Sequence, residues 1–485
     1  MTGNNIRGAI AAGHELTAKA GAAMLREGGT AMDAGVAALA MACVCEPVLA
    51  SPGGGGFAMI KRADTGTVSL IDFFPQTPKR RGPNASEGFV DILADFGTAT
   101  QRFHIGPASV ATPGFFRGVE AISADGARFS LCDLFDPAIQ AARGGVTVTP
   151  YQSHLAKIVL AILTSTPDAA RLFAPGGSPP PAGGTVYNPD LGFALETMAR
   201  GGFADSEIGR TILKMQADRG NLTKHDLEVY QVQHRDPLEI ACGGSSVFLN
   251  PLPAASGTII AYALDRLAGP APIDMARALD TADRARTQAD GDLAVLSRAP
   301  LRQKGTTHIS VADAEGNACA ITVSNGAGNG EVVDGFGFML NNILGEEDVN
   351  PFGGADWPAD TRLASMMCPT LVIEPDGGIC ALGSGGSNRI RSAIFQTLAR
   401  HCVRGETLAE AITAPRMHVE AGHLDIEGQF RDGDLADCIA AFPDHRIWPG
   451  GNMFFGGVHG VRCGPDGRLT GIGDPRRDGV ALIVE

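Results

Sequence analysis

Apolar residues recur at helical spacing near the start of the chain. Residues 16–26 are rich in good helix formers and stop before Gly28-Gly29. A second helix is predicted to begin near Asp33 and to end at Pro47. Its apolar face is formed by residues at helical spacing, namely Val36, Leu39, Ala40 and Cys43.

A glycine-rich loop, 51–57, follows these two helices and leads into residues that alternate like strands at 58–61 and 68–73. A run of four glycines can cradle a phosphate, but this one lacks the Gly-Lys-Ser/Thr ending of such loops. We therefore expect it to allow close packing of backbone against a neighbouring strand or an active site.

Further along, residues 129–230 are predicted to be mainly helical, with a Pro/Gly surface loop at 175–184 and a short turn at Asp226-Leu227. Residues 265–300 are again helical and polar in pattern. The chain shows no internal repeat.

The most informative pattern is an alternating stretch, 304–313, that ends in the turn signal 314–317 and resumes at 318–324. These segments predict an antiparallel hairpin. If Asp313 lies opposite Ala318, Thr306 lies opposite Asn325 and beside Ser324, so polar side chains surround Thr306.

Composition and charge narrow the class of protein. Among 485 residues, 44% are hydrophobic and 19% are charged, which excludes general disorder. The 64 glycines and 30 prolines predict a mixed structure with many tight turns rather than a helical bundle. A formal charge of −14 without a dense basic run argues against nucleic-acid binding.

Neither a metal site nor a membrane anchor is predicted. The ten cysteines have no Cys-x-x-Cys pairing, so we expect buried free thiols and no metal ligation. No uninterrupted membrane span is present, and the start of the chain lacks the pattern of a secretory signal. The expected location is the cytoplasm.

Thr306 has the surroundings of a nucleophile. A threonine hydroxyl needs an adjacent base, and cleavage before Thr306 would create an α-amine whose reference pKa of about 7.7–8.0 suits that task. Gly305 suits the cleavage point because it has no Cβ to shield its carbonyl. Thr-Thr in a strand is also ordinary structure, so these residues alone do not decide the matter.

Short motifs along nearly the whole chain carry a resemblance to the γ-glutamyltranspeptidase family. Before the hairpin they are Gly28–Ala34, Glu46-Pro47, Gly53–Phe57, Thr112–Gly114, Asn221–Thr223 with Asp226-Leu227 and Tyr230, and Pro251–Gly257. From the hairpin on they are Thr306-Thr307-His308 with Ser310, Gly316–Ala318, Leu340–Asn342, Pro369-Thr370, Gly383–Arg389, Ala414–Arg416 and Asp474–Arg476.

The resemblance implies an α+β fold, the four-layer αββα sandwich of N-terminal-nucleophile hydrolases. The precursor would divide into residues 1–305 and residues 306–485, two pieces intertwined in one domain. It implies a small-molecule amide substrate, no cofactor, no nucleic-acid or membrane partner, and association of the two pieces after self-cleavage. A homo-oligomer is possible.

The resemblance also assigns roles. Thr306 matches the nucleophile, and Ser324 stands where the family has a threonine that bonds the nucleophile and assists processing. Asn325 matches a substrate-contacting asparagine. Gly385 and Gly386 match the glycine segment whose backbone N–H groups form the oxyanion hole.

The matched substrate pocket departs from the family pattern. Phe74 replaces an arginine that pairs with the α-carboxylate of the glutamyl group, and Ser365-Met366 replaces a pair of serines. Glu346 keeps the acidic charge for the substrate α-amino group, while Ile343 replaces a nearby glutamine. Losing these partners of the carboxylate would cost on the order of 2–5 kcal/mol in a desolvated site, so glutathione is expected to be a poor substrate.

Several functions remain open at this point. A self-processing amidase or acyltransferase acting on γ-glutamyl or related acyl amides leads, and an acylase or small-amide hydrolase with a non-glutamyl substrate is the alternative. An uncut relative acting as a binding or scaffold protein is a third reading. A metal-dependent hydrolase is disfavoured because the histidines at 14, 104, 308 and 418 lack ligand spacing.

Overall fold

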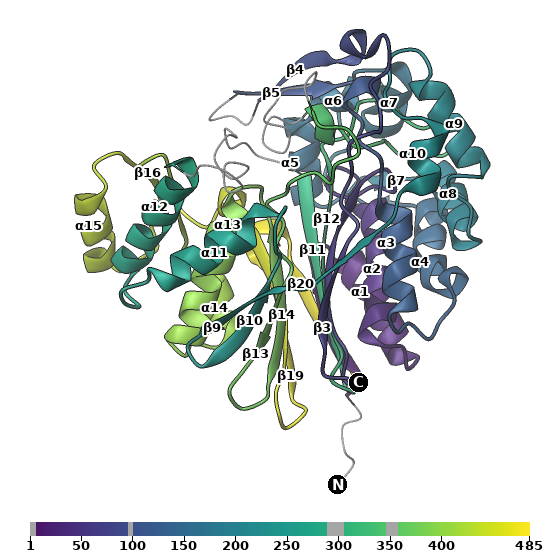
Figure 1. The fold of residues 1–485 in the computed structure, drawn as a ribbon. Coiled ribbons are helices and arrows are strands. Elements are labelled where there is room, and N and C mark those ends of the chain that lie inside the picture. The colour runs from purple at the N-terminus through teal and green to yellow at the C-terminus, as the bar shows by residue number, and fades with distance from the viewer. Residues whose placement is uncertain (1–5, 96–99, 289–304, 346–356) are drawn as a thin grey trace.

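The computed structural model describes residues 6–95, 100–288, 305–345 and 357–485. Two β-sheets lie face to face at its centre, and helices cover the outer face of each sheet (Figure 1). This is the αββα sandwich expected from the sequence.

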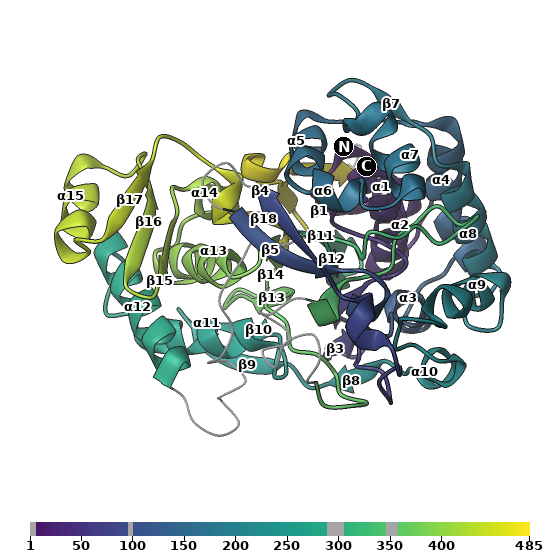
Figure 2. The same cartoon turned by 90° about the horizontal axis from the view of Figure 1, so that it is seen from above.

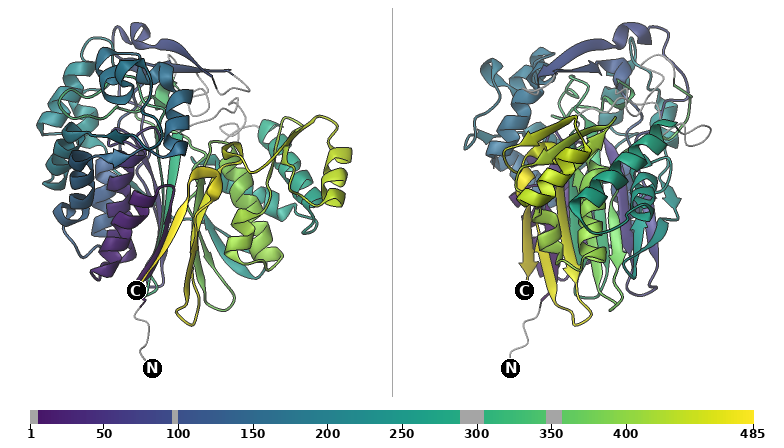
Figure 3. Two further views of the ribbon diagram at one scale, coloured as in Figure 1. Left: turned by 180° about the vertical axis from the view of Figure 1, so that it is seen from behind. Right: turned by 90° about the vertical axis from the view of Figure 1, so that its left-hand side faces the viewer.

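The first sheet has seven antiparallel strands and contains the predicted hairpin at its centre. In spatial order they are β20 (Val480–Val484), β1 (Gly8–Ala12), β11 (Gly305–Asp313), β12 (Ala318–Gly326), β2 (Gly55–Lys61), β3 (Val68–Asp72) and β8 (Gln233–Arg235). Strands β1 and β20, from opposite ends of the chain, therefore lie side by side (Figure 3).

The second sheet has six antiparallel strands, drawn mostly from the last third of the chain. In spatial order they are β19 (Leu469–Ile472), β18 (Gly457–Cys463), β14 (Ile379–Gly385), β13 (Thr370–Ile373), β10 (Ser245–Leu249) and β9 (Leu238–Cys242). Its strand β14 packs on β11 and β12 of the first sheet.

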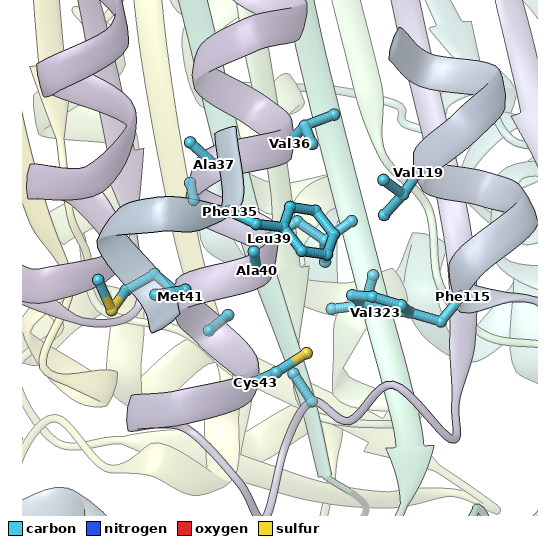
Figure 4. Packing of buried hydrophobic residues seen from close by; sticks show 14 of the residues in the cluster. Val36, Ala37, Leu39, Ala40, Met41, Cys43, Phe115, Val119, Phe135 and Val323 are labelled. Atoms are coloured by element: carbon cyan, nitrogen blue, oxygen red, sulfur yellow. The ribbon is translucent and has the colours of Figure 1, made fainter. Parts of the chain in front are cut away.

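Helices α1 (Glu15–Arg26), α2 (Ala31–Cys45) and α3 (Phe115–Ala124) cover the first sheet. Every residue of α2 is buried, because α1 and α4 (Leu131–Gly144) enclose the faces that do not meet the sheet. Figure 4 shows this packing, in which Val36, Leu39 and Cys43 of α2 lie among Phe115, Val119, Phe135 and Val323. The two helices predicted from the sequence are thus confirmed.

Helix α8 (Pro189–Ala199) packs on α4, and further elements lie above and beside this pair in Figure 1. The further helices are α5 (Pro150–Ile158), α6 (Leu160–Leu163), α7 (Pro167–Phe173), α9 (Glu207–Gln216) and α10 (Lys224–Val229). The strand pairs are β4 (Val90–Asp95) with β5 (Thr100–Ile105), and β6 (Val146–Thr147) with β7 (Thr185–Val186). Residues 129–230 are therefore mainly helical, as predicted. Asp226-Leu227, expected to form a short turn, instead lies within helix α10, which begins with a capping box between Thr223 and Asp226.

The second sheet is covered by helices from two distant parts of the chain. They are α11 (Ala255–Asp265), α13 (Arg389–Leu398) and α14 (Leu408–Thr413), and α12 (Pro272–Gln288) packs on α11. A small sheet, β15 (Met417–Glu420), β16 (His423–Glu427) and β17 (His445–Trp448), lies outside them with α15 (Asp432–Ala441) (Figure 2). The helical prediction for 265–300 holds for α12 up to residue 288, and the remainder lies outside the described residues.

Short 3₁₀ turns link several of these elements, and one π-helical turn (Ala399–Val403) continues α13. The 3₁₀ turns are η1 (Ala85–Gly88), η2 (Pro107–Ser109), η3 (Pro175–Gly177), η5 (Ile343–Gly345), η7 (Met453–Phe455) and η8 (Pro475–Arg477). No helix in the described part of the chain is both long enough and apolar enough to span a membrane.

Candidate active site

A β-bulge at the upper end of β11 and β12 sets the geometry around Thr306 (Figure 1). Thr307 pairs with Val323 and Gly305 pairs with Gly326, so one residue on β11 faces two residues on β12. Ser324 and Asn325 consequently both lie opposite Thr306. The neighbourhood predicted for Thr306 is confirmed.

The register predicted for the rest of the hairpin was wrong by one residue. Ala312, not Asp313, lies opposite Ala318. The reason lies in the turn, where the Asp313 carboxylate accepts the N–H groups of Glu315 at 3.0 Å and Asn317 at 2.9 Å. Asp313 therefore belongs to the turn and does not pair with Ala318. The bulge shifts the pairing by one residue, so that Gly305 pairs with Gly326 as predicted.

Ser324 contacts the bond predicted to be cut. Its hydroxyl donates a hydrogen bond to the carbonyl oxygen of Gly305 and accepts one from the N–H of Gly326 at 3.0 Å. Both Thr306 and Ser324 are buried. A donor on the Gly305 carbonyl withdraws electron density from its carbon, which favours attack by a neighbouring hydroxyl.

Two glycines are required by close backbone approaches at this site. A Cβ on Gly305 would collide with the carbonyl oxygen of Val48, and a Cβ on Gly385 would collide with the carbonyl oxygen of Thr306. The end of β14 is thus held directly against Thr306. Gly386 follows with φ of +126°, a conformation that L side chains rarely adopt.

The side-chain amide oxygen of Asn325 is an unsatisfied hydrogen-bond acceptor within the part of the chain that the structure describes. The residue is 1% exposed, and its amide oxygen is buried without a hydrogen-bond partner among the described residues. A buried, unsatisfied acceptor costs about 1–3 kcal/mol, and such groups in native structures call for an explanation. A donor on a bound substrate would satisfy it.

Glu46 is a neighbour of the site to which the sequence reasoning gave no role. Its carboxylate accepts hydrogen bonds from Thr307 Oγ1 and Thr17 Oγ1, both at 2.7 Å, and the residue is fully buried. Burial raises the pKa of Glu46, and the bonds from Thr307 and Thr17 oppose that change. The sequence feature that could have identified Glu46 is its position as a single acidic residue at the end of the apolar helix α2, because a buried carboxylate needs hydrogen-bond partners.

His308 is a buried strand residue whose ring contacts two hydroxyls. Its Nδ1 lies 2.8 Å from Thr322 Oγ1, and its Nε2 lies 2.8 Å from Ser310 Oγ. Burial lowers the pKa of His308 well below its usual value. The imidazole is therefore neutral and joins the two strands of the hairpin.

Phe74 follows β3, and the strands β12 and β2 lie between β3 and the strand of Thr306. It is buried and stacks on Phe57 with ring centroids 5.4 Å apart. Met366 packs against the same core cluster between the sheets. Ser365 is nearby in sequence, but its hydroxyl accepts the N–H of Met367 at 3.1 Å. Glu346 lies outside the described residues.

Arg362 was missed by the sequence reasoning. Its guanidinium donates to the carbonyl oxygen of Phe74 and to the hydroxyl of Tyr230, and it lies 3.7 Å from the Asp72 carboxylate. It therefore lies against the backbone of the segment that contains Asp72 and Phe74. Asp72 is fully buried and also pairs with Arg235 at 2.8 Å, so it needs these cations.

Two stacked sheets between helical layers, with a buried threonine where an inner hairpin starts, define the class of N-terminal-nucleophile amidohydrolases. The sequence profile of γ-glutamyltranspeptidase matches residues 17–278 and 263–484. The chain belongs to the γ-glutamyltranspeptidase family. It is an enzyme of the kind that is made as a precursor and acts on amide bonds.

Relatives of this chain carry two kinds of name. It is 28% identical to the acylase ACY 1 proenzyme of Pseudomonas sp. (strain V22), over 99% of this chain and 94% of that protein. It is 27% identical to the glutathione hydrolase proenzyme of Escherichia coli (strain K12), over 97% of this chain and 90% of that protein. Among solved structures, a cephalosporin acylase from Bacillus halodurans shares the fold with a TM-score of 0.82, at 21% identity, over 98% of this chain and 96% of that one.

Proposed function

We propose that the protein cuts its own chain between Gly305 and Thr306 and then uses Thr306 as the nucleophile of an amidohydrolase or acyltransferase. The observation that carries this proposal is the hydrogen bond from Ser324 to the Gly305 carbonyl oxygen, inside the bulge that places Ser324 and Asn325 opposite Thr306.

Self-cleavage would proceed in two steps. The Thr306 hydroxyl adds to the Gly305 carbonyl carbon while Ser324 polarises the oxygen, and the C–N bond then breaks to leave an ester and a free α-amine. Water next adds to the ester, which releases the Gly305 carboxylate and regenerates the Thr306 hydroxyl. The new α-amine stays beside the hydroxyl as its base.

Turnover would reuse the same groups. The Thr306 hydroxyl attacks the substrate amide as its amine takes the proton, and that proton then passes to the leaving amine. The N–H groups of Gly385 and Gly386 are the proposed oxyanion donors, a role worth about 2.7–4 kcal/mol per donor in comparable sites. Water, or a second amine, then releases the acyl group from Thr306.

The residues matched to the family's substrate pocket support a substrate other than glutathione. Phe74 and Met366 pack in the apolar core between the sheets, so neither offers a carboxylate a charged or hydroxyl partner. Arg362 is already engaged with Phe74, Tyr230 and Asp72. We propose that acyl groups without an α-carboxylate bind better than γ-glutamyl. The unsatisfied Asn325 oxygen would accept a donor of the substrate. A cytoplasmic location and a homo-oligomer remain predictions.

Intact mass tests the self-cleavage. Purified wild-type protein should yield two fragments that meet between Gly305 and Thr306, and a Thr306→Ala variant should stay whole. A single uncut chain from folded wild-type protein under all conditions would favour the scaffold reading instead.

Matched anilides test the acyl group. γ-Glutamyl, glutaryl and butyryl anilides differ only in the groups on the acyl chain, and kcat/KM should be about tenfold or more higher for butyryl than for γ-glutamyl anilide. Intermediate values for glutaryl would report the cost of the carboxylate alone. The highest kcat/KM on γ-glutamyl anilide would contradict the apolar-pocket proposal while leaving the nucleophile intact.

A further inference from the structure

Three groups with the chemistry of metal ligands converge at the far end of β14 from the active site. They are the Glu374 carboxylate in the β13–β14 turn, the Cys380 thiol of β14 and the His401 imidazole of the π-helical turn. Across the described ranges, no other set of three such side chains gathers this closely. Glu374 and Cys380 are six residues apart and His401 follows Cys380 by 21, a spacing that matches no common metal-binding motif.

Their distances match a tetrahedral zinc site. Cys380 Sγ lies 3.4 Å from Glu374 Oε1 and 3.5 Å from His401 Nε2, and His401 Nε2 lies 2.8 Å from Glu374 Oε1. Bond lengths of about 2.3 Å to sulfur and about 2.0–2.1 Å to nitrogen or oxygen give tetrahedral edges of about 3.3–3.6 Å. Only the His401–Glu374 edge must lengthen, by about half an ångström.

The outer contacts orient each ligand atom. The His401 Nδ1–H donates to the carbonyl oxygen of Glu406 at 2.8 Å, so Nε2 is the ring nitrogen that faces Cys380 and Glu374. Nε2 gives up its proton to solvent when an ion binds there. Arg462 holds Glu374 Oε2 at 2.6 Å and also contacts Oε1 at 3.1 Å. Oε1 is the oxygen that faces Cys380 and His401. Metal-ligating histidines and carboxylates are held in this manner by neighbouring carbonyls and donors.

The position of the cluster separates it from the proposed catalysis. Cys380 precedes Gly385 by five residues on one strand, which places it about 17 Å from the glycine that touches Thr306. Cys380 is fully buried, and the side chains of Glu374 and His401 are each 10% exposed. An ion can reach such a cluster, but a substrate cannot. His401 also lies on a π-helical turn, a rare feature that is often found at functional sites.

We propose that Glu374, Cys380 and His401 bind one borderline divalent cation, with Zn²⁺ as the ion whose ligand preferences they match. The Cys380 thiol loses its proton to solvent and binds as the thiolate, and a water completes the fourth position. The ion ties the β13–β14 turn to the π-helical turn. This site goes beyond the proposed amidase function and does not depend on it.

Cobalt binding tests the site directly. Wild-type protein treated with a chelator is titrated with Co²⁺, whose tetrahedral complexes give visible d–d bands and, with a thiolate ligand, a near-ultraviolet charge-transfer band. One equivalent should produce both, and Zn²⁺ should displace them. Cys380→Ala should abolish the charge-transfer band, and His401→Gln should raise the Kd for Co²⁺ about tenfold or more.

A matched control is Cys319→Ala, since Cys319 is a buried cysteine of β12 and belongs to a different core cluster. It should leave the cobalt spectrum unchanged. Folded wild-type protein without a charge-transfer band, or a Cys380→Ala spectrum that keeps it, overturns the proposal and leaves a buried ion-pair cluster. If Cys380→Ala does not fold, native mass spectrometry decides: one bound zinc in wild type and none in His401→Gln supports the site, and equal zinc in both overturns it.

Discussion

At the scale of single residues, Ser324 is the side chain whose contact bears most directly on self-cleavage. Replacing it with alanine removes the donor to the Gly305 carbonyl oxygen and leaves that oxygen without the polarising bond. We expect Ser324→Ala to slow cleavage about 10²-fold, the cost of losing one donor of this kind. The fraction of cut chain by intact mass over time measures it.

Ser324→Thr is the matched control, because it keeps the hydroxyl in the position where the family has a threonine. It should cleave at close to the wild-type rate. If Ser324→Ala kept the wild-type rate, Ser324 would be a structural residue of the bulge.

Gly385 carries a second residue-scale prediction. A Cβ at this position collides with the carbonyl oxygen of Thr306, so Gly385→Ala must push the two sheets apart locally. Overpacking of this kind costs about 1–3 kcal/mol, and it displaces the nucleophile from the glycine segment. We expect a lower Tm together with slower cleavage. Gly433→Ala in helix α15, where a Cβ meets nothing within 4 Å, should leave cleavage unchanged and should not lower Tm.

Single residues also show what sequence reasoning can and cannot reach. Thr306, Ser324 and Asn325 were brought together correctly because they lie on adjacent strands joined by a short turn, where alternation and turn signals define the pairing. Glu46 contacts Thr307 of the hairpin, and Arg362 contacts the segment of Asp72 and Phe74, both from far along the chain. Their partners depend on tertiary packing, which no local pattern encodes.

At the scale of elements, the start of α2 depends on Asp33. This fully buried carboxylate accepts the N–H of Thr30 at 2.7 Å and the N–H groups of Arg128 and Phe129 at 2.9 Å each. It therefore caps one helix and fastens the loop that precedes α4. Asp33→Ala would leave several buried donors unpaired, so we expect a loss of about 2–4 kcal/mol in the free energy of unfolding.

Glu410→Ala is the matched control for Asp33, because Glu410 holds the same position in the capping box of α14 but lies on the surface. It should cost only about 1 kcal/mol. Denaturant unfolding of the two variants gives both values. Equal losses would mean that burial adds nothing to the Asp33 network.

Helices and strands were predicted correctly where the hydrophobic pattern was long. Strand register and helix boundaries were predicted wrongly where a single side chain bonded to the backbone of a turn. The apolar periodicity of α1 and α2 and the two strands of the hairpin were correct. The register slipped because Asp313 bonds the turn with its side chain, a contact that alternation cannot reveal. Asp226 likewise turned an expected turn into the first turn of α10.

At the scale of the whole molecule, buried histidines make stability depend on pH. His459 is buried between the sheets, where its Nδ1 accepts the N–H of Asp474 at 3.2 Å. Burial lowers the pKa of His459 to about 4, against the nearby Asp474 charge, which raises it. Because the unfolded chain binds the proton more readily, this residue's contribution is fully present above about pH 6.5 and falls as the pH drops toward 4.

Comparison with His459→Asn isolates this effect, because asparagine can still accept the N–H of Asp474 but does not titrate. The free energy of unfolding of wild type relative to the variant should fall by up to about 3 kcal/mol between pH 7 and pH 4. Parallel pH profiles for the two proteins would show that His459 is not buried in its neutral form.

The strand order of the first sheet implies that the chain folds before it is cut. Strands β11, β12 and β20 alternate with β1 and β2, so a cut before Thr306 would leave two chains interleaved within one hydrogen-bonded sheet. As a single chain, the protein reaches this arrangement by an intramolecular search whose rate does not depend on concentration. After the cut, the same arrangement could be regained only by the meeting of two separate molecules. Because the covalent link that guided assembly would be gone, the cut protein could not refold efficiently once unfolded. Its lifetime would then be set by a slow rate of unfolding.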